Sequence, residues 1–332
     1  MRTWRTTGLL FFLACLAGVS RAGAAWEPVQ NLAPHHLVFL QPVSGPAPAG
    51  SVPYWVQFSA GYATVYSLES GAGRSLLLDM EIARLALRGA VRLARGVEVG
   101  LEVPFLWAGG GIFDGALIAY HDLVRLPGGG REDAPRDAWR HRVVTPRGEY
   151  SPAPPGGLSL ADAVVFARSA PTQGPRLYAE ARGALKLPTG DPGRGSGSGH
   201  PDASAGTAVL LKLGLFDLGA SADAIWLGGS PDPALRLERR WSAALSGGLF
   251  VPAPWGLGRL SARVRYRTSP YGTGLSVMDR DVVMFVGELA GRSGRWMWSL
   301  GFTEDLTVHA SPDFSVFLRV AWAPSSFSTP ER

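Results

Sequence analysis

Cysteine is nearly absent from this sequence, whose 332 residues include a single one, Cys15. It lies in an apolar run from Gly8 to Val19, which follows two arginines and precedes the small residues Ala22-Gly23-Ala24. A charged start, a hydrophobic middle and a small-residue cleavage site together predict a secretory signal peptide over residues 1–24. The mature chain would then contain no cysteine, which excludes disulfides and thiol chemistry.

Long hydrophobic runs are missing after the signal, so no helix of about 18 apolar residues is predicted to span a membrane. A lipoprotein in which Cys15 carries the lipid is the alternative, but it leaves a very short hydrophobic region. Charged residues are only 18% of the chain, and the net charge of +5 includes three arginines of the signal. Without them the net charge is +2, which gives no basis for a nucleic-acid partner.

Strict alternation of apolar and polar residues is present, most clearly over residues 85–107. Two alternating arms flank Gly96, which can adopt the left-handed backbone that a tight connection needs. If paired residue numbers sum to 190, Arg92 faces Glu98 and Arg88 faces Glu102, and apolar residues meet on the other face. The pattern therefore predicts a β-hairpin with one apolar and one charged face.

Similar segments recur along the chain and define the predicted fold. An even number of strands, most with the roughly 9–11 residues that a tilted membrane strand needs, is typical of bacterial outer-membrane barrels. Every second connection is short, as periplasmic turns are, and the longest ones, 108–157 and 188–204, fall where outer loops are expected. We predict an all-β, antiparallel transmembrane β-barrel of about 12 strands; a soluble β-sandwich is the alternative. The strand segments are 52–67, 76–94, 97–107, 158–169, 176–187, 205–215, 218–227, 237–251, 258–268, 277–290, 295–305 and 313–322.

The two ends of the mature chain differ from the middle. Residues 25–51 contain several prolines and no clear period, so we expect a plug-like N-terminal segment packed on or in the barrel. Residues 52–322 form the barrel and 323–332 a C-terminal tail. The last strand ends in Trp322, which resembles the terminal aromatic strand that outer-membrane assembly machinery recognises. Tryptophans and tyrosines near other strand ends suit the bilayer interfaces, so the expected partners are the lipid bilayer, the assembly machinery and a small solute.

Charged side chains gather on the strand face that we expect to line the lumen. They could form a salt-bridge network that fills a narrow interior, or a cationic lining that favours anions. Both interpretations stay open from the sequence. The residues are Arg84, Arg88, Arg92, Glu98, Glu102, Glu180, Arg182, Lys186, Lys212, Asp223, Arg263, Arg265, Arg267 and Arg319.

The long loop after the third strand holds the residues closest to a catalytic pattern. Apolar residues recur at helical spacing over 112–126 and predict a short helix in this outer loop. His121 and Asp122 could act as a pair, because a carboxylate can orient an imidazole, but no partnered nucleophile is evident. His35-His36 has no third ligand at useful spacing. We therefore predict no enzyme activity, no metal and no cofactor.

Parts of the sequence resemble known bacterial proteins. The block NLAPHHL…QP over residues 31–42, with GGIFDG…YHD…LP over residues 110–127, resembles a family of exported, barrel-like outer-membrane proteins of unknown function. The stretch LKLPTGD over residues 185–191 resembles a strand-to-loop motif of outer-membrane channels of the aromatic-degradation type. Neither resemblance implies a known activity.

These features favour a Gram-negative outer-membrane protein that acts as a passive channel or small-solute transporter. A non-conducting structural or binding barrel is the alternative. A barrel-embedded hydrolase is the least favoured interpretation, because it needs a nucleophile beside a histidine near the bilayer.

Overall fold

The computed structural model describes residues 27–45, 52–93, 96–111, 137–154, 156–169, 172–173, 176–254, 257–307, 311–312 and 314–324, together with Gly115 and Pro135. The predicted signal peptide lies outside these residues. So do the predicted loop helix, apart from Gly115, and its candidates His121 and Asp122, as well as most of the C-terminal tail.

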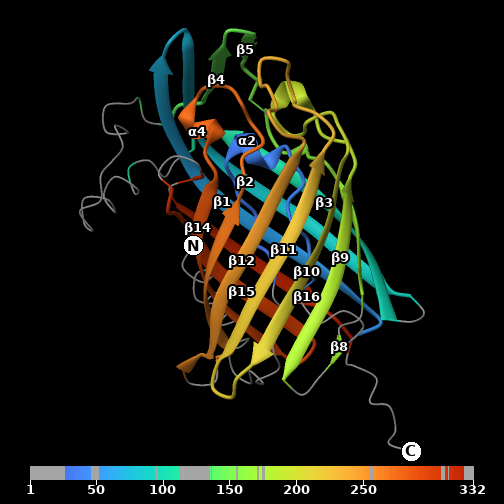
Figure 1. Cartoon of the computed structure of the whole chain (residues 1–332). Helices are drawn as coiled ribbons and strands as arrows, with labels where there is room; N and C mark the ends of the chain where they lie inside the picture. Colours follow the sequence, from blue (N-terminus) through green and yellow to red (C-terminus); the bar gives the residue numbers. More distant parts are fainter. Residues whose placement is uncertain are drawn as a thin grey trace, which may run out of the picture.

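Twelve long strands form a closed antiparallel barrel, as predicted (Figure 1). They are β1 (Tyr54–Gly71), β2 (Arg74–Arg92), β3 (Val97–Gly109), β7 (Val164–Ser169), β9 (Leu177–Lys186), β10 (Asp202–Lys212), β11 (Asp217–Leu227), β12 (Trp241–Pro252), β13 (Arg259–Arg267), β14 (Val282–Ser293), β15 (Trp296–Asp305) and β16 (Phe314–Trp322). Each pairs with the next in this order, and β1 pairs with β16 to close the ring. Closure leaves the barrel strands without an exposed edge, which is what a lipid environment requires of a sheet.

The hairpin from which the prediction began has the expected register. Arg92 pairs with Glu98 and Arg88 with Glu102 across β2 and β3, and Gly96 has a φ of 79°. At the other end of β2, Ala72 and Gly73 form a two-residue turn in which both φ values are positive. Such turns match the twist of the strands that they join.

Shorter strands extend or complete the wall. β4 (Arg140–Thr145) pairs with residues 75–79 of β2, beyond the end of β3, and with β5 (Gly148–Tyr150). β6 (Ser159–Leu160) and β7 both pair with β3, so the predicted strand 158–169 exists but is interrupted at residues 161–163. β8 (Thr172–Gln173) pairs with β9 beyond the end of β7.

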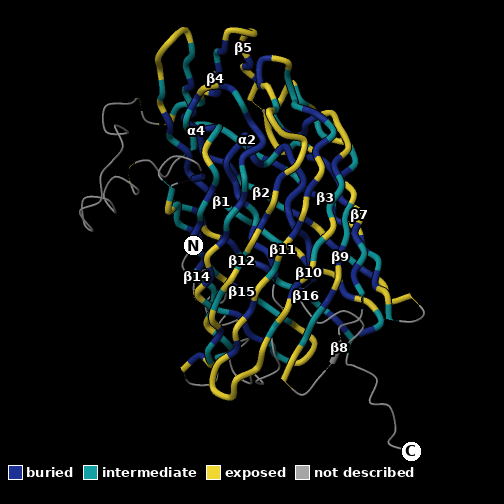
Figure 2. Tube along the Cα trace, viewed as in Figure 1, coloured by how far each residue is buried: buried dark blue, intermediate teal, exposed yellow. Residues whose placement is uncertain are grey.

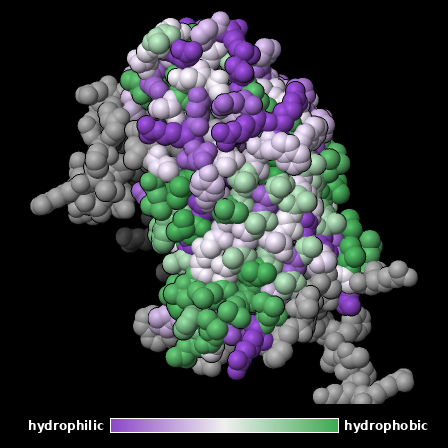
Figure 3. Space-filling view, in the orientation of Figure 1, coloured by the Kyte–Doolittle hydropathy of each residue, from purple (hydrophilic) through white to green (hydrophobic). Residues whose placement is uncertain are grey.

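Burial alternates along the strands and separates an inner from an outer face (Figure 2). On β11 the alternate residues Asp217, Asp223 and Ile225 are buried, whereas Leu218 and Trp226 are exposed. Large exposed apolar side chains recur in this outward phase on most strands. In Figure 3 hydrophobic residues cover the lower part of the visible wall and hydrophilic residues the upper end. This is the pattern of a barrel with an apolar outer band and a polar interior.

The long connections of the barrel all belong to one of its two ends. Those after β3, β9, β11 and β13 are long and lie at one end with β4 and β5, which we call the outer end (Figure 1). Those after β2, β10 and β14 are short and lie at the opposite end. The long connections are therefore all odd ones, as the sequence predicted, although the first connection, Ala72-Gly73, is also short and lies at the outer end.

The N-terminal segment, residues 27–45, is almost wholly buried. It runs toward the outer end, turns through the short helix α2 (Pro34–Leu37) and returns. Gln41 joins the two arms, because its side chain accepts from the Asn31 amide at 2.7 Å and donates to the Asn31 carbonyl at 2.8 Å. The segment is thus a U-shaped unit without regular strand structure.

Several strand limits differ from those predicted, and the reason is packing inside the barrel. Residues 276–279 form a helical turn, α4 (Ser276–Asp279), and β14 begins only at Val282, although we predicted a strand over 277–290. Val286 faces inward and packs on Val29 of the N-terminal segment and on Phe317. Apolar residues on both faces of β14 hide its alternation.

Candidate functional site: the barrel interior

The barrel interior collects most of the charged residues that the sequence assigned to the lumen. Arg84 is half-buried, whereas Arg92 and Lys212 are exposed, because they are the last residues of β2 and β10 at the end with the short connections. The others are buried: Arg88, Glu98, Glu102, Glu180, Arg182, Lys186, Asp223, Arg263, Arg265, Arg267 and Arg319.

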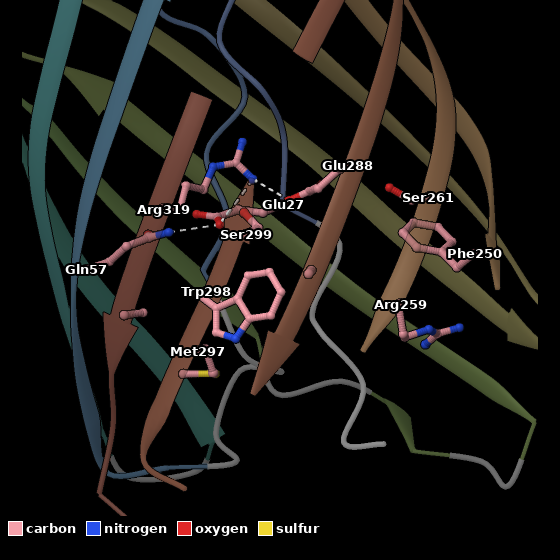
Figure 4. A pocket seen from close by; sticks show the side chains of 12 residues that line it. Glu27, Gln57, Phe250, Arg259, Ser261, Glu288, Met297, Trp298, Ser299 and Arg319 are labelled. Carbon is pink, nitrogen blue, oxygen red and sulfur yellow. Dashed lines mark hydrogen bonds and ion pairs between the residues drawn. The ribbon is translucent and has the colours of Figure 1, made fainter. Parts of the chain in front are cut away.

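The carboxylate of Glu27, in the N-terminal segment, contacts three neighbouring strands of the barrel, β2, β1 and β16 (Figure 4). One of its carboxylate oxygens accepts from Arg88 at 2.6 Å. The other accepts from Gln57 at 2.9 Å and lies 3.4 Å from Arg319. Arg88 also pairs with Glu102, which Arg84 reaches as well. Burying these charges is tolerable because each has partners of opposite sign.

A second cluster surrounds Arg168 of β7. Its Nε donates to Glu98 at 2.6 Å, and its Nη1 lies 3.7 Å from Glu180. Its guanidinium stands 5.8 Å from the ring of Trp55, which donates to Glu98 at 3.0 Å. Glu180 accepts from Ser44 of the N-terminal segment at 2.9 Å. This cluster holds the returning arm of the segment against β7 and β9.

Lys186 is the centre of a third cluster, which explains the LKLPTGD motif. Its ammonium contacts Asp162 at 2.7 Å, Asp202 at 3.1 Å, and donates to the Val38 carbonyl of the N-terminal segment at 2.6 Å. Asp162 also accepts from the amide of Gly190 at 2.8 Å. The inward turn of Asp162 is what interrupts the strand between β6 and β7.

The Thr189 hydroxyl is hydrogen-bonded to the backbone at both ends of the interruption at residues 161–163. It donates to the Ala161 carbonyl at 2.8 Å and accepts from the Ala163 amide at 2.9 Å. The Ala161 amide donates to the carbonyl of Pro104, which itself has no amide hydrogen to give to the ladder. The backbone groups of Ala161 and Ala163 are therefore hydrogen-bonded, as a wall facing lipid needs.

The N-terminal segment is held mainly through its backbone carbonyls. An irregular chain leaves its carbonyls without ladder partners, and the long cationic side chains of the wall meet them. These contacts come from strands spread around the ring, so the segment lies within it. The donors are Arg88 to Ser44, Arg319 to Pro28, Arg267 to Leu40, Lys186 to Val38 and Arg263 to Glu27, at 2.6–3.2 Å, with the Tyr271 hydroxyl donating to His35 at 2.8 Å.

Small hollows remain beside the segment. One lies between Glu27, Arg259, Glu288 and Trp298 (Figure 4). Another lies beside Val29 and the inner face of β1 and β16. Both border charged side chains, so water and small polar solutes suit them better than apolar ligands.

Several charged residues of the barrel interior were not assigned to the lumen from the sequence. Arg168 and Glu288 lie in the inward phase of their strands and could have been found from alternation, although the apolar inner residues of β14 obscured the second. Asp162 breaks its strand, and Asp202 precedes the strand predicted from residue 205, so neither had a usable signal. Glu27 lies in a segment without periodicity.

His35 and His36, the neighbouring histidines noted in the sequence, form no metal-binding group with other described residues. His35 and His36 lie in α2, with ring centroids 4.4 Å apart. Within the described residues, no group of three or more His, Cys, Asp or Glu is arranged to hold a metal ion. In that same part of the chain, no helix is long and apolar enough to cross a membrane.

Comparison with known proteins agrees with this architecture. Residues 28–151 match the model of a family described as protein of unknown function (DUF3187), in line with the resemblance seen in the sequence. No curated protein matches the chain. Among solved structures, the COG4313 outer membrane channel from Pseudomonas putida F1 is 16% identical, with 85% of this chain and 99% of that chain covered and a TM-score of 0.51. The fold is that of an outer-membrane β-barrel.

Two toluene transporters are more distant from this outer-membrane barrel. TodX from P. putida is 11% identical, covers 82% of this chain and 90% of its own, and has a TM-score of 0.36. TbuX from Ralstonia pickettii is 8% identical, covers 92% and 98%, and has a TM-score of 0.35. The assignment of the fold rests on the COG4313 channel and on the strand pairing.

Proposed function

We propose that this protein is an outer-membrane channel for passive passage of small polar or charged solutes, with a lumen narrowed by its N-terminal segment. The observation that carries the proposal is the closed ring of strands with an apolar outer face around a charged interior. Its similarity in fold to an outer membrane channel supports the same function.

The N-terminal segment acts in this proposal as a plug. Residues 1–24 are the signal peptide, 25–51 the plug, 52–322 the barrel and 323–332 the tail. The plug is held by ion pairs and by hydrogen bonds to its carbonyls, and water can replace these one at a time. Loosening the plug therefore needs no change in the strands.

Planar-bilayer recording tests the proposal. We expect low conductance from the full-length mature chain and higher conductance from a variant that lacks residues 27–51. Glu27→Gln, which weakens the contacts to Arg88 and Arg319, should open more often. Arg142→Gln should behave as wild type, since it only removes an exposed ion pair with Glu149. Folded protein without conductance in any of these variants would overturn the channel.

A sealed barrel is the second candidate. It is favoured by the close pairing of the interior charges, for example Arg182, which makes two hydrogen bonds to Asp223 at 2.6–2.8 Å. A sealed barrel predicts no conductance even after the plug is removed. The deletion variant therefore separates the two functions.

A further inference from the structure

Arg265 lies on the inward face of β13, between two arginines that bind the N-terminal segment. These neighbours, Arg263 and Arg267, donate to the carbonyls of Glu27 and Leu40. Within the described residues, Arg265 makes no hydrogen bond and no ion pair, although only 7% of its surface is exposed. The N-terminal segment is thus bound on both sides of Arg265 but not at it.

The groups around Arg265 are also incompletely paired. Next to it in the ladder lies Ser246 of β12, whose hydroxyl is buried without a partner. One guanidinium nitrogen of Arg182 and one of Arg267 are also buried without a hydrogen-bond partner. The unpartnered nitrogens of Arg182 and Arg267 therefore belong to residues whose charges also act on Arg265.

The local charge is positive. Arg182, Arg263, Arg267 and Asp223 are the charged groups that act on Arg265. Asp223 is the one carboxylate among them, and Arg182 already binds both of its oxygens. Arg265 is left with neighbouring cations and with no carboxylate bound to it. A buried guanidinium in this state is unfavourable unless water or an anion meets it.

We propose that Arg265, with Ser246 and the unpartnered nitrogens of Arg182 and Arg267, forms a binding site for a small oxyanion, the carboxylate or phosphate group of a solute. The planar guanidinium presents paired N–H donors at the spacing of two carboxylate or phosphate oxygens. A serine hydroxyl beside it adds a neutral donor. The site lies on the same stretch of wall as the contacts of Arg263 and Arg267 with the segment's carbonyls, but it uses the nitrogens that those contacts leave unpartnered.

The proposal rests on the channel function only because the anion must reach the lumen from water. Binding is therefore tested by stability and not by current. The thermal unfolding midpoint of the folded barrel in detergent is measured by its shift on a gel, with inorganic phosphate or acetate as the probe and chloride at equal ionic strength as the reference. Phosphate or acetate should raise the midpoint, and the rise should grow with the logarithm of the anion concentration above the dissociation constant.

Arg265→Gln should abolish this rise. It should fold normally, because no protein partner is lost, and Arg265→Lys should retain a reduced rise, since it keeps the charge but not the paired donors. Arg142→Gln, which removes an exposed arginine far along the chain, should respond as wild type. A response to acetate alone or to phosphate alone identifies the group that is bound.

Two results would overturn the site. One is that neither anion raises the unfolding midpoint of the wild type. The other is that the midpoint of Arg265→Gln rises by the same amount as that of the wild type. Failure of the channel is a separate result. If the barrel conducts, Arg265→Gln should move its reversal potential toward cation preference. If it does not conduct, the anion-dependent midpoint still decides whether the site exists.

Discussion

At the scale of single residues, His141 is a buried titratable group outside the membrane wall. It lies on β4, beyond the end of β3, and its ring centroid is 5.4 Å from that of Tyr150. Burial, with a smaller contribution from the charge of His35, lowers the pKa of His141 to about 3. Burial also raises the pKa of Tyr150, so both rings stay neutral at ordinary pH.

This lowered pKa makes stability depend on pH. Between pH 6.5 and about 3 the unfolded chain binds a proton at His141 that the folded chain does not, so the free energy of unfolding falls as pH decreases. The loss is at most about 1.4 kcal/mol for each pH unit. Urea unfolding at pH 7.5 and 4.5 should show a smaller drop for His141→Gln than for wild type. An equal drop in both would assign the pH dependence to other groups.

At the scale of elements, the interrupted strand between β6 and β7 depends on one ammonium group. Lys186 faces the carboxylates of Asp162 and Asp202 and holds the Val38 carbonyl, so it links the strand break, the start of β10 and the N-terminal segment. A carboxylate pair this deeply buried is stable only with a cation between its members.

Lys186→Gln should therefore destabilise the barrel by about 3–5 kcal/mol, the usual cost of leaving a buried charge without its partner. The urea midpoint of the gel shift measures this loss. Arg142→Gln, which breaks an exposed pair, should change it by less than about 1 kcal/mol. A wild-type midpoint for Lys186→Gln would mean that water replaces the ammonium at no cost.

The same element shows where reasoning from sequence ends. Alternation predicted the strands and the register of β2 on β3, because these depend on residues close in the chain. It could not predict the Lys186 cluster, in which Lys186 and Val38 are 148 residues apart. Nor could it pair the interior charges with the N-terminal segment, since a segment without a period gives no register. The face on which Arg265 lies was predictable; its lack of a partner was not.

At the scale of the whole molecule, ring closure predicts resistance to detergent. The folded barrel should migrate faster than the boiled protein on a gel run without prior heating, because a closed sheet has no edge at which unfolding can start. The shift should be found in the outer-membrane fraction. Protein in the soluble periplasm with no shift would contradict the membrane barrel and favour a soluble sandwich.

The contacts of the N-terminal segment also set an order of events during biogenesis. Pro28 is held by Arg319, 291 residues later, and the Glu27 carbonyl by Arg263, 236 residues later. These bonds require the last strands to be in place, so the N-terminal segment can settle only after the barrel has closed. Contacts so distant in the chain form slowly. A newly inserted barrel should therefore pass through a stage in which its wall is complete and the N-terminal segment is not yet bound inside it, and under the proposed function each new copy would conduct during that interval.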